Sequence, residues 1–332
     1  MIKKIYNLDK INNLKFDKFY IFPKNNFSIF LSKKIKNNRN LFFVDNFKKN
    51  KNQKNLISEK QIDDNVKNVV FFTNPDVIQY FKNTKLKKIQ KVVFHEKNKI
   101  KIDLDKNKIN FKNLNQIFLY FNCDKGSNYF EYQKKLRGHN YSKFYKKIFG
   151  HLTLKKIKIL ELGAAFGAST ASFLNYFKKS KIITTDINED IFKYTSKRIK
   201  FIKLNYLNIK QVNNLKKRSK NFDIIIDDGD HSKTHILKNL NNFFSLVNTN
   251  GYYVIEDIGF SENFDYKNDD MKELSVLTIL DNLKKKIKFK SNYIKYVDQE
   301  KLMNDISEIK IFKGAMKKNK KLVSIIAFIK KK

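Results

Sequence analysis

The sequence predicts an α/β fold in two domains. From Ile157 onward, short β-branched runs alternate with helical patterns through five successive strand and helix units, which is typical of a mostly parallel sheet. Two of these runs, Ile224–Ile226 and Tyr252–Ile255, are followed by acidic residues. A chain of 332 residues also has room for a second domain, since domains commonly hold roughly 100 to 200 residues. We expect a small α/β domain at 1–115 and a larger one at 116–332.

The net charge of +38 suggests a polyanion partner, but its distribution argues against specific nucleic-acid recognition. The chain has only four arginines, which are Arg39, Arg137, Arg198 and Arg218. Lysine therefore supplies nearly all of the excess, and it is spread along the chain beside Asn and Ile. Surfaces that bind phosphate usually employ Arg, whose planar head makes two bonds to one group. We interpret the charge as a compositional bias and expect no specific nucleic-acid partner.

Cysteine usage and hydropathy predict a cytoplasmic protein. The single Cys123 excludes an internal disulfide framework and suits a reducing compartment. The first residues carry charge or Asn every few positions, so they lack the apolar core of a signal peptide. No window holds about 18 apolar residues in a row, so we expect no transmembrane segment.

The first domain shows the spacing of a small parallel α/β unit. Expected strands lie at 19–22, 41–44 and 69–73, and expected helices at 27–35 and 76–81. The order resembles the small Rossmann-like domains that precede other domains in sugar-modifying enzymes. In those domains a glycine-rich turn follows the first strand, whereas here residues 23–26 contain no glycine and cannot easily approach a pyrophosphate. We therefore predict a degenerate, structural module, with a solvated loop at 47–53 and a charged hairpin or linker at 97–112.

The second domain begins with a transition segment at 124–149. Gly126 and Ser127 indicate a turn, after which aromatic and aliphatic residues recur at helical spacing at Tyr141, Phe144, Tyr145, Ile148 and Phe149. This stripe is either the core face of a helix or, together with its neighbours, part of a pocket. In the second interpretation, the residues at the rim of a cofactor or substrate pocket are Lys125, Ser127, His139 and Tyr141.

Strands and helices then alternate to the end of the chain. Strands are expected at 157–162, 181–185, 200–204, 222–227 and 251–256, and helices at 168–177, 189–197, 208–217, 233–247 and near 271–285. Apolar segments at 306–312 and 322–329, separated by Gly314 and lysines, predict a closing antiparallel hairpin.

A glycine loop after the first strong strand predicts a nucleoside site. Gly163 and Gly167 allow a tight turn before a helix, and Asp186 ends the next strand, where a carboxylate can accept both hydroxyls of a ribose. The glycine spacing fits neither a dinucleotide fingerprint nor a P-loop, so the ligand has no pyrophosphate to cradle. S-adenosylmethionine is such a ligand. Asp186 could instead serve only as a helix N-cap. The candidate cofactor-binding residues are Glu161, Gly163, Ala165, Gly167, Ser169, Asp186, Asn205, Tyr206, Asp227, Lys125 and Ser127.

Acidic residues and histidines gather where two further strands end. Three carboxylates, Asp228, Glu256 and Asp257, would repel one another unless a cation lies between them, and oxygen ligands suit Mg²⁺. His231 follows on the same loop and can take a proton from a hydroxyl, as a general base. Asp227 and His235 are candidates for orienting Asp228 and His231. The alternative is that these residues only cap a helix and hydrogen-bond to one another.

At these residues the chain resembles the class I S-adenosylmethionine-dependent methyltransferases. It is more narrowly similar to the metal-dependent sugar O-methyltransferases of the macrocin and mycinamicin type and their bacterial relatives in surface-polysaccharide loci. The matching elements span about residues 120–330 and are DKGS (124–127), HNYSKFY (139–145), ILELGAAFGAS (159–169), TTDIN (184–188), FDIIIDDGDH (222–231), GYYVIED (251–257) and the terminal hairpin.

The resemblance implies a Rossmann-like methyltransferase domain with a mostly parallel, seven-stranded sheet. It further implies that Asp228, Glu256 and Asp257 bind Mg²⁺, that His231 is the base, and that the acceptor is a hydroxyl of a sugar in a nucleotide sugar, a surface polysaccharide or a glycosylated metabolite. His139, Tyr141 and His235 are candidates for a supporting or substrate-binding role, and homo-oligomerisation is left open.

Two residues depart from the family pattern. Asp230 stands where a serine is usual before the His, and Asn205 stands where an acid commonly contacts the adenine amino group. Two other functions are kept as alternatives. One is a basic nucleic-acid-binding protein or RNA methyltransferase, although no Asn/Asp-Pro-Pro-Tyr/Phe motif is present. The other is a metal-dependent hydroxylase-like relative.

Overall fold

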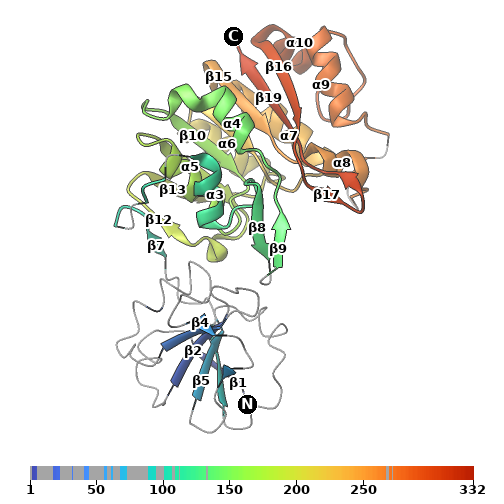
Figure 1. Ribbon diagram of the computed structural model, residues 1–332. Helices are drawn as coiled ribbons and strands as arrows, with labels where there is room; N and C mark the ends of the chain where they lie inside the picture. Colours follow the sequence, from blue (N-terminus) through green and yellow to red (C-terminus); the bar gives the residue numbers. More distant parts are fainter. Residues whose placement is uncertain are drawn as a thin grey trace. The chain divides into compact units, whose positions relative to one another are not determined.

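The computed structural model describes most of the C-terminal two thirds of the chain and short segments of the remainder. The described residues are 2–5, 18–22, 32, 41–44, 56–57, 61–62, 68–72, 89–94, 101–106, 109–111, 113–131, 134–266, 269–270 and 272–332. The chain divides into two compact units (Figure 1). Unit 1 holds Met1–Ile102 and Phe130–Leu136, and unit 2 holds Asp103–Tyr129 and Arg137–Lys332.

Unit 1 contains a six-stranded sheet in the order β1-β6-β5-β2-β3-β4, in which every pair is parallel. The strands are β1 (Ile2–Ile5), β2 (Lys18–Phe22), β3 (Leu41–Val44), β4 (Leu56–Ile57), β5 (Asn68–Phe72) and β6 (Ile89–Phe94). Phe19, Tyr20 and Ile21 are all buried, so β2 is covered on both faces, as parallel sheets require. The strands predicted at 19–22, 41–44 and 69–73 are confirmed as β2, β3 and β5. The helices predicted at 27–35 and 76–81, the turn at 23–26 and the loop at 47–53 lie outside the described residues, apart from Ser32.

Unit 2 is built on a seven-stranded sheet, as predicted. Its strands, from one edge to the other, are β13 (Ile199–Lys203), β11 (Lys181–Asp186), β10 (Lys158–Leu162), β14 (Phe222–Asp227), β15 (Val247–Ile255), β19 (Ile325–Lys331) and β16 (Ile306–Lys313). The first five are parallel to one another. Strand β19 runs antiparallel to both of its neighbours, so the predicted closing hairpin is confirmed. The strand order reverses at β10, and such a switch point is where open α/β sheets bind ligands.

Helices cover the sheet of unit 2 with two chemically different layers. The helices are α3 (Leu114–Phe121), α4 (Ser142–Phe149), α5 (Ala168–Tyr176), α6 (Ile209–Arg218), α7 (Lys233–Phe243), α8 (Ile258–Asn263), α9 (Val276–Lys285) and α10 (Tyr296–Asp305). Helices α6, α7, α9 and α10 contribute aliphatic side chains such as Leu237 and Leu280 to one core cluster with β10, β14 and β15. Figure 1 shows α9 and α10 beside β16, which both of them contact.

The other layer is aromatic and confirms the predicted core face of α4. Tyr145 and Phe149 pack on Phe328 of β19, at ring-centroid distances of 5.6 Å each. Tyr145 also packs on Phe173 of α5, which in turn meets Phe118 of α3 edge to face. These rings bury large apolar areas against one another, which fixes α3, α4 and α5 as one layer.

The structure corrects one predicted element of unit 2 and adds several. The helix predicted at 189–197 is wrong, because residues 189–191 form a single 3₁₀ turn, η4 (Glu189–Ile191), followed by the short strand β12 (Tyr194–Thr195). The backbone here bonds to distant segments: the Lys193 N–H donates to Phe166 O, and the Leu104 N–H donates to Thr195 O. Such bonds satisfy the groups that a helix would otherwise satisfy, so tertiary contacts override the local pattern.

The remaining elements are short or end earlier than expected. Helix α7 ends at Phe243 and continues as the 3₁₀ turn η5 (Phe244–Leu246), while η3 (Gly150–Leu152) follows α4. Helices α3, α8 and α10 are not predicted by the sequence analysis. Short strands are β7 (Ile102–Asp103), β8 (Asn128–Glu131), β9 (Lys134–Arg137), β17 (Lys317–Lys318) and β18 (Lys321–Leu322). Within the described residues, no helix is long and apolar enough to cross a membrane.

Candidate active site

The residues singled out in the sequence follow neighbouring strands at one edge of the sheet of unit 2. Leu162 of β10 lies in register with Thr185 of β11 and with Asp227 of β14. Asp227 in turn pairs with Ile255, the last residue of β15. The glycine loop, Asp186, the segment after Asp227 and the Glu256–Asp257 pair therefore leave the sheet side by side. The predicted convergence of these segments is present in the structure.

The glycine loop presses directly on the end of the neighbouring strand. Gly163 has a φ of +92°, and a Cβ placed on it would lie only 2.1 Å from the carbonyl oxygen of Asp228. The Gly163 N–H donates to Thr185 O at 2.9 Å, so the loop is fixed to β11 as well. Gly167 has a φ of +84°, and its Cβ would meet the Phe192 ring at 2.5 Å. Both positions therefore require glycine for conformation and for space.

Asp186 connects the loop to the end of β11. Its Oδ2 accepts from the Ala165 N–H at 2.8 Å, and its Oδ1 accepts from the Asn188 N–H at 2.9 Å. A carboxylate offers about four acceptor positions, so two remain for the hydroxyls of a ribose. The cap of the following 3₁₀ turn is Asn188, whose side chain accepts from the Asp190 N–H. Asp186 is therefore not the cap residue of η4.

Two of the candidate cofactor-binding residues, Glu161 and Ser169, are buried and stabilise the fold. Glu161 is fully buried, and its carboxylate accepts from the hydroxyls of Ser169, Thr170 and Thr184. Burial raises the pKa of this carboxyl, although the hydroxyl donors act in the opposite direction. Because Glu161 and Ser169 bind each other, they hold the start of α5 against β10. Their contact with the cofactor stays a prediction.

Asn205 and Tyr206, which follow β13, bind to nearby residues of the protein. The Asn205 side-chain oxygen accepts from the Leu207 N–H at 3.0 Å, while the Asn205 N–H donates to Gln211 Oε1 at 2.8 Å. The Tyr206 hydroxyl lies 3.2 Å from Thr185 Oγ1, and its ring lies close to Gly229. Tyr206 therefore packs between two strand ends. The predicted adenine contact of Asn205 stays a prediction.

Lys125 is inserted between two of the predicted metal ligands. Its side chain is almost fully buried, and its Nζ donates to Asp228 Oδ2 and to Glu256 Oε2. The other oxygen of Glu256, Oε1, accepts from the Tyr145 hydroxyl at 2.6 Å. Burial lowers the pKa of Lys125, but the charges of Asp228 and Glu256 outweigh it and raise this pKa well above its ordinary value. Lys125 is thus a charged ammonium group among carboxylates.

Asp257 is held by a second cation. Its Oδ1 lies 2.7 Å from His139 Nδ1 and accepts from the Tyr141 hydroxyl at 2.6 Å. Burial lowers the pKa of His139, but the adjacent Asp257 charge raises it to about 9. Burial alone would raise the pKa of Asp257, yet the His139 charge holds it below its usual range. Ser324 Oγ completes the arrangement at 2.9 Å from His139 Nδ1.

His231 stands at the open side of this cluster. Its backbone has a φ of 63°, which is uncommon for a residue with a side chain and is often found at functional sites. Its ring stacks on Phe260 of α8, with centroids 5.5 Å apart. Asp228, His231 and Asp257 each offer one ligand atom, and these atoms lie within 4.8 Å of one another. This spacing would suit a metal ion.

The other predicted supporting residues have partners of their own. His235 Nδ1 lies 2.6 Å from Ser232 Oγ and 3.0 Å from Asp230 Oδ1, so Asp230 pairs with His235. Asp227 accepts from Asn239 Nδ2 at 3.1 Å and from the Tyr253 hydroxyl at 2.9 Å. Burial raises the pKa of Asp227 to about 7. Asp227 therefore faces the core side chains of α7 and β15, and its contact with the cofactor stays a prediction.

The polar role of Tyr145 and the position of Phe260 beside His231 are not predicted from the sequence. Tyr145 belongs to the aromatic stripe at 141–149, and its ring is fully buried, as a core face requires. A tyrosine in place of phenylalanine at such a position is itself a signal, because a buried hydroxyl usually finds a hydrogen-bond partner. Ser127, a candidate cofactor-binding residue, donates its backbone N–H to Asn115 Oδ1 at 2.7 Å, and its contact with the cofactor stays a prediction.

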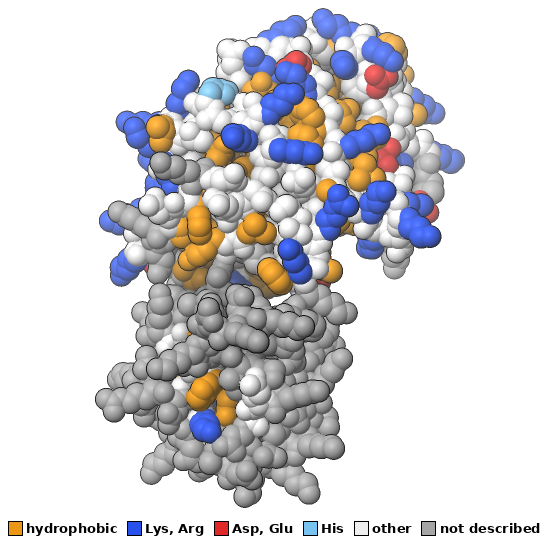
Figure 2. Space-filling view, viewed as in Figure 1, with side chains coloured by type: hydrophobic (Ala, Val, Ile, Leu, Met, Phe, Trp, Pro, Cys, Tyr) orange, Lys and Arg blue, Asp and Glu red, His pale blue; other side chains and the backbone are white. Residues whose placement is uncertain are grey.

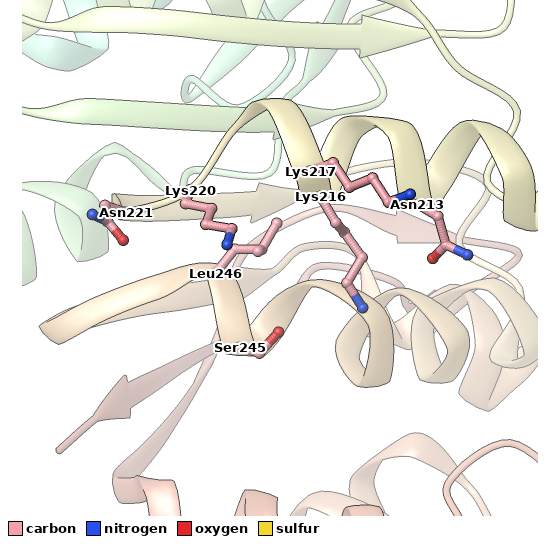
Figure 3. Close-up of a pocket in the computed structure, with 7 residues that line it drawn as sticks. All are labelled: Asn213, Lys216, Lys217, Lys220, Asn221, Ser245 and Leu246. Carbon is pink, nitrogen blue, oxygen red and sulfur yellow. The ribbon is translucent and has the colours of Figure 1, made fainter.

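A separate hollow lies at the opposite edge of the sheet. It is lined by Asn213, Lys216, Lys217, Lys220, Asn221, Ser245 and Leu246 (Figure 3). These residues precede β14 and β15, so they lie at the amino ends of the strands. Lysines elsewhere on unit 2 are scattered over the visible face and do not form one patch (Figure 2). The lysines of the hollow are therefore part of the general lysine excess of the chain. The hollow has neither the carboxylates nor the glycine loop of the candidate active site.

A known family matches the part of the chain that holds the candidate site. Residues 148–274 match the family described as Rhamnosyl O-methyltransferase/CmcI. No curated protein matches the chain. Among solved structures, MycE methyltransferase from the mycinamycin biosynthetic pathway, in complex with Mg and S-adenosylhomocysteine (SAH), is 20% identical at a TM-score of 0.49. The match covers 66% of this chain and 54% of MycE, so this chain spans about half of that protein.

A second solved structure is more distant. An O-methyltransferase from Bacillus cereus, in complex with SAH, is 15% identical at a TM-score of 0.35, covering 57% of this chain and 79% of that one. At such identities and TM-scores, the likeness of the solved structures carries no conclusion about substrate or metal. The family match over residues 148–274 covers the glycine loop, Asp186 and the whole acidic segment.

Proposed function

We propose that this chain, a class I S-adenosylmethionine-dependent O-methyltransferase of the type described by the family that it matches, methylates a hydroxyl of a sugar. The acceptor would be a nucleotide sugar or a sugar in a polysaccharide or glycosylated metabolite. The observation that carries the proposal is the meeting of two sites at one sheet edge: the Gly163 loop with Asp186, and the cluster of Asp228, His231 and Asp257.

The methyl donor is proposed to bind along the Gly163 loop. The Gly163 and Gly167 backbone brings the chain close to the strand ends, and Asp186 has acceptor positions for ribose hydroxyls. Ala165 is exposed on this loop, next to Asp186, so its surface is open to a ligand. The sulfonium methyl would then point toward the acidic cluster.

The acidic cluster is proposed to hold a divalent cation, most simply Mg²⁺. Carboxylate oxygens of Asp228, Glu256 and Asp257 are the ligands that this ion prefers. When bound, the ion would supply a lowered pKa to an acceptor hydroxyl that contacts it. The donor set fits, although both oxygens of Glu256 have protein partners in this structure.

His231 is proposed as the general base. Because Mg²⁺ prefers oxygen ligands, its imidazole would remain available to accept the hydroxyl proton. The acceptor oxygen then forms a bond to the methyl carbon while the carbon–sulfur bond breaks, and SAH leaves with the electron pair. Stacking on Phe260 restricts the rotation of the ring, so its nitrogens keep a fixed direction. A positioned base typically contributes about 10² to 10⁴ in rate.

The alternative of a metal-dependent hydroxylase-like protein has one observation in its favour. One imidazole and two carboxylates, the set of His231, Asp228 and Asp257, also suit iron or zinc. In that case His231 would be a ligand and could not act as the base. The glycine loop and Asp186 favour the methyl donor, since a hydroxylase needs no nucleoside at this edge.

Binding and product analysis test the proposal. S-adenosylmethionine should bind to the purified protein, and a panel of nucleotide sugars incubated with both should gain the mass of one methyl group. A chelator should abolish the product, and Asp228→Ala should do the same, whereas the surface control Asp281→Ala should not. Methylation by Asp228→Ala at the parental rate would refute the metal assignment. Absence of S-adenosylmethionine binding would refute the proposed function itself.

A further inference from the structure

We propose that Lys125 is a built-in cation that competes with the divalent ion for Asp228 and Glu256. The inference rests on the metal site of the proposed function and assigns a role to a residue that this function does not use. Lys125 would fill the acidic cluster while no metal is bound, and its ammonium group would have to leave these oxygens when the metal enters.

The first support is that the ligand oxygens converge on the lysine. One oxygen of Asp228 and one of Glu256 accept from the same Nζ, although they follow different strands. Oxygens that meet around one ammonium group are placed as they would be around a metal ion. Glu256 has no second oxygen to offer freely, because Oε1 accepts from the Tyr145 hydroxyl. A metal that used Glu256 would therefore compete with Lys125 or with Tyr145.

The second support is that the backbone of Lys125 is fixed. The Lys125 carbonyl accepts from the Tyr141 N–H at 2.8 Å, and Asp124 O accepts from the His139 N–H at 2.7 Å. A Cβ on Gly138 would lie 2.2 Å from Gly126 O, so the two segments are in close contact. Since the backbone cannot move away, only the side chain of Lys125 can yield to a metal. This side chain has four rotatable bonds, so a change of rotamer would be enough.

The third support is electrostatic. Asp228 is half-buried, Glu256 and Asp257 are buried, and a buried charge without a partner is strongly destabilising. Without metal, the Lys125 ammonium offsets part of this negative charge and so stabilises the fold. If a divalent ion bound the same carboxylates, the ammonium group would repel it. The ammonium group and the metal ion therefore exclude each other, and either one offsets part of the negative charge of the carboxylates.

This competition predicts in which direction the affinity for Mg²⁺ changes when the charge of Lys125 is removed. Lys125→Met keeps the length and the apolar stem, but it leaves Asp228 and Glu256 without their cation. The variant should bind Mg²⁺ more tightly, by about tenfold for each 1.4 kcal/mol of competition removed. It should also unfold at a lower temperature than the parent in a chelator, and Mg²⁺ should raise its unfolding temperature more than that of the parent. If Lys125 were a fixed support of the metal ligands, its loss would weaken Mg²⁺ binding.

The experiment is a calorimetric titration of the full chain with Mg²⁺ alone, followed by thermal unfolding with Mg²⁺ or a chelator. Neither measurement includes a methyl donor or an acceptor, so neither depends on turnover. Lys290→Met, at an exposed lysine of unit 2, is the matched control and should behave as the parent. Lys125→Gln, which retains an N–H donor but no charge, replaces Lys125→Met if the latter does not fold.

The outcomes separate this inference from the proposed function. Tighter Mg²⁺ binding by the Lys125 variants supports the competition. Equal or weaker binding overturns it, even if the parent still methylates a sugar. If neither parent nor variant binds Mg²⁺, both the competition and the metal assignment are wrong, while methyl transfer without a metal would remain measurable on the parent.

Discussion

His139 gives the most direct link between the buried charges and a measurable quantity. In the folded protein its pKa is raised from 6.5 to about 9, because the charge of Asp257 outweighs burial. A group whose folded pKa is raised contributes stability that is fully present below the unfolded pKa and is lost as the pH rises through the folded pKa. The His139 contribution should therefore be complete below about pH 6.5 and absent above about pH 9.

The size of the effect follows from the shift. One pKa unit corresponds to about 1.4 kcal/mol, so a rise from 6.5 to about 9 is worth up to about 3 kcal/mol at pH 6. His139→Asn removes the charge while its amide can still donate to Asp257 from the position of Nδ1. Ser324 Oγ, at 2.9 Å from Nδ1, can accept from the same amide. The variant should then lack the pH-dependent part of this stability and keep most of the packing.

Urea unfolding at pH 6 and pH 9.5, in a chelator, measures this difference. Between these two values the parent should lose about 3 kcal/mol more of its free energy of unfolding than His139→Asn does. Other groups titrate alike in both proteins and cancel in the comparison. Parallel losses in the parent and the variant would refute the assignment of His139 as a protonated partner of Asp257.

Three further changes test the geometry of the site. Gly163→Ala should abolish S-adenosylmethionine binding and destabilise the protein by at least about 2 kcal/mol, because its Cβ would lie 2.1 Å from a carbonyl oxygen. The control Gly150→Ala should change the unfolding temperature little, because the nearest atom to its Cβ is 3.9 Å away. Tyr145→Phe leaves Glu256 Oε1 without its donor and should cost about 1 to 3 kcal/mol in urea unfolding; an unchanged midpoint would argue against that hydrogen bond. Phe260→Ala should lower kcat while leaving the affinity for SAH unchanged, and an equal loss of both would contradict a role confined to the base.

The strands of unit 2 and the edge of the sheet that holds the site were largely predictable from local pattern. Phe222–Asp227 holds three consecutive β-branched residues and ends in an acid within six residues, so both the strand and its end at the site can be predicted. The failure at 189–197 has the opposite cause. There, Ile191 and Tyr194 have the i, i+3 spacing of a helix. However, Phe192 and Tyr194 both pack against Gly167, and the backbone of this segment bonds to distant segments. No pattern within nine residues contains that information.

The sequence by itself determined which chemistry gathers at the sheet edge: a glycine loop without a phosphate motif, an aspartate after the next strand, and acids with a histidine after two others. These follow from strand ends, because neighbouring parallel strands end at the same edge. Only the tertiary structure decided how the charges are paired. Lys125 lies 103 residues from Asp228 and 131 from Glu256, and Tyr145 lies 111 from Glu256, so their contacts depend on how α4 and the preceding turn pack over the sheet. Burial then gives these contacts their strength, since a charge removed from water is stable only beside its partner.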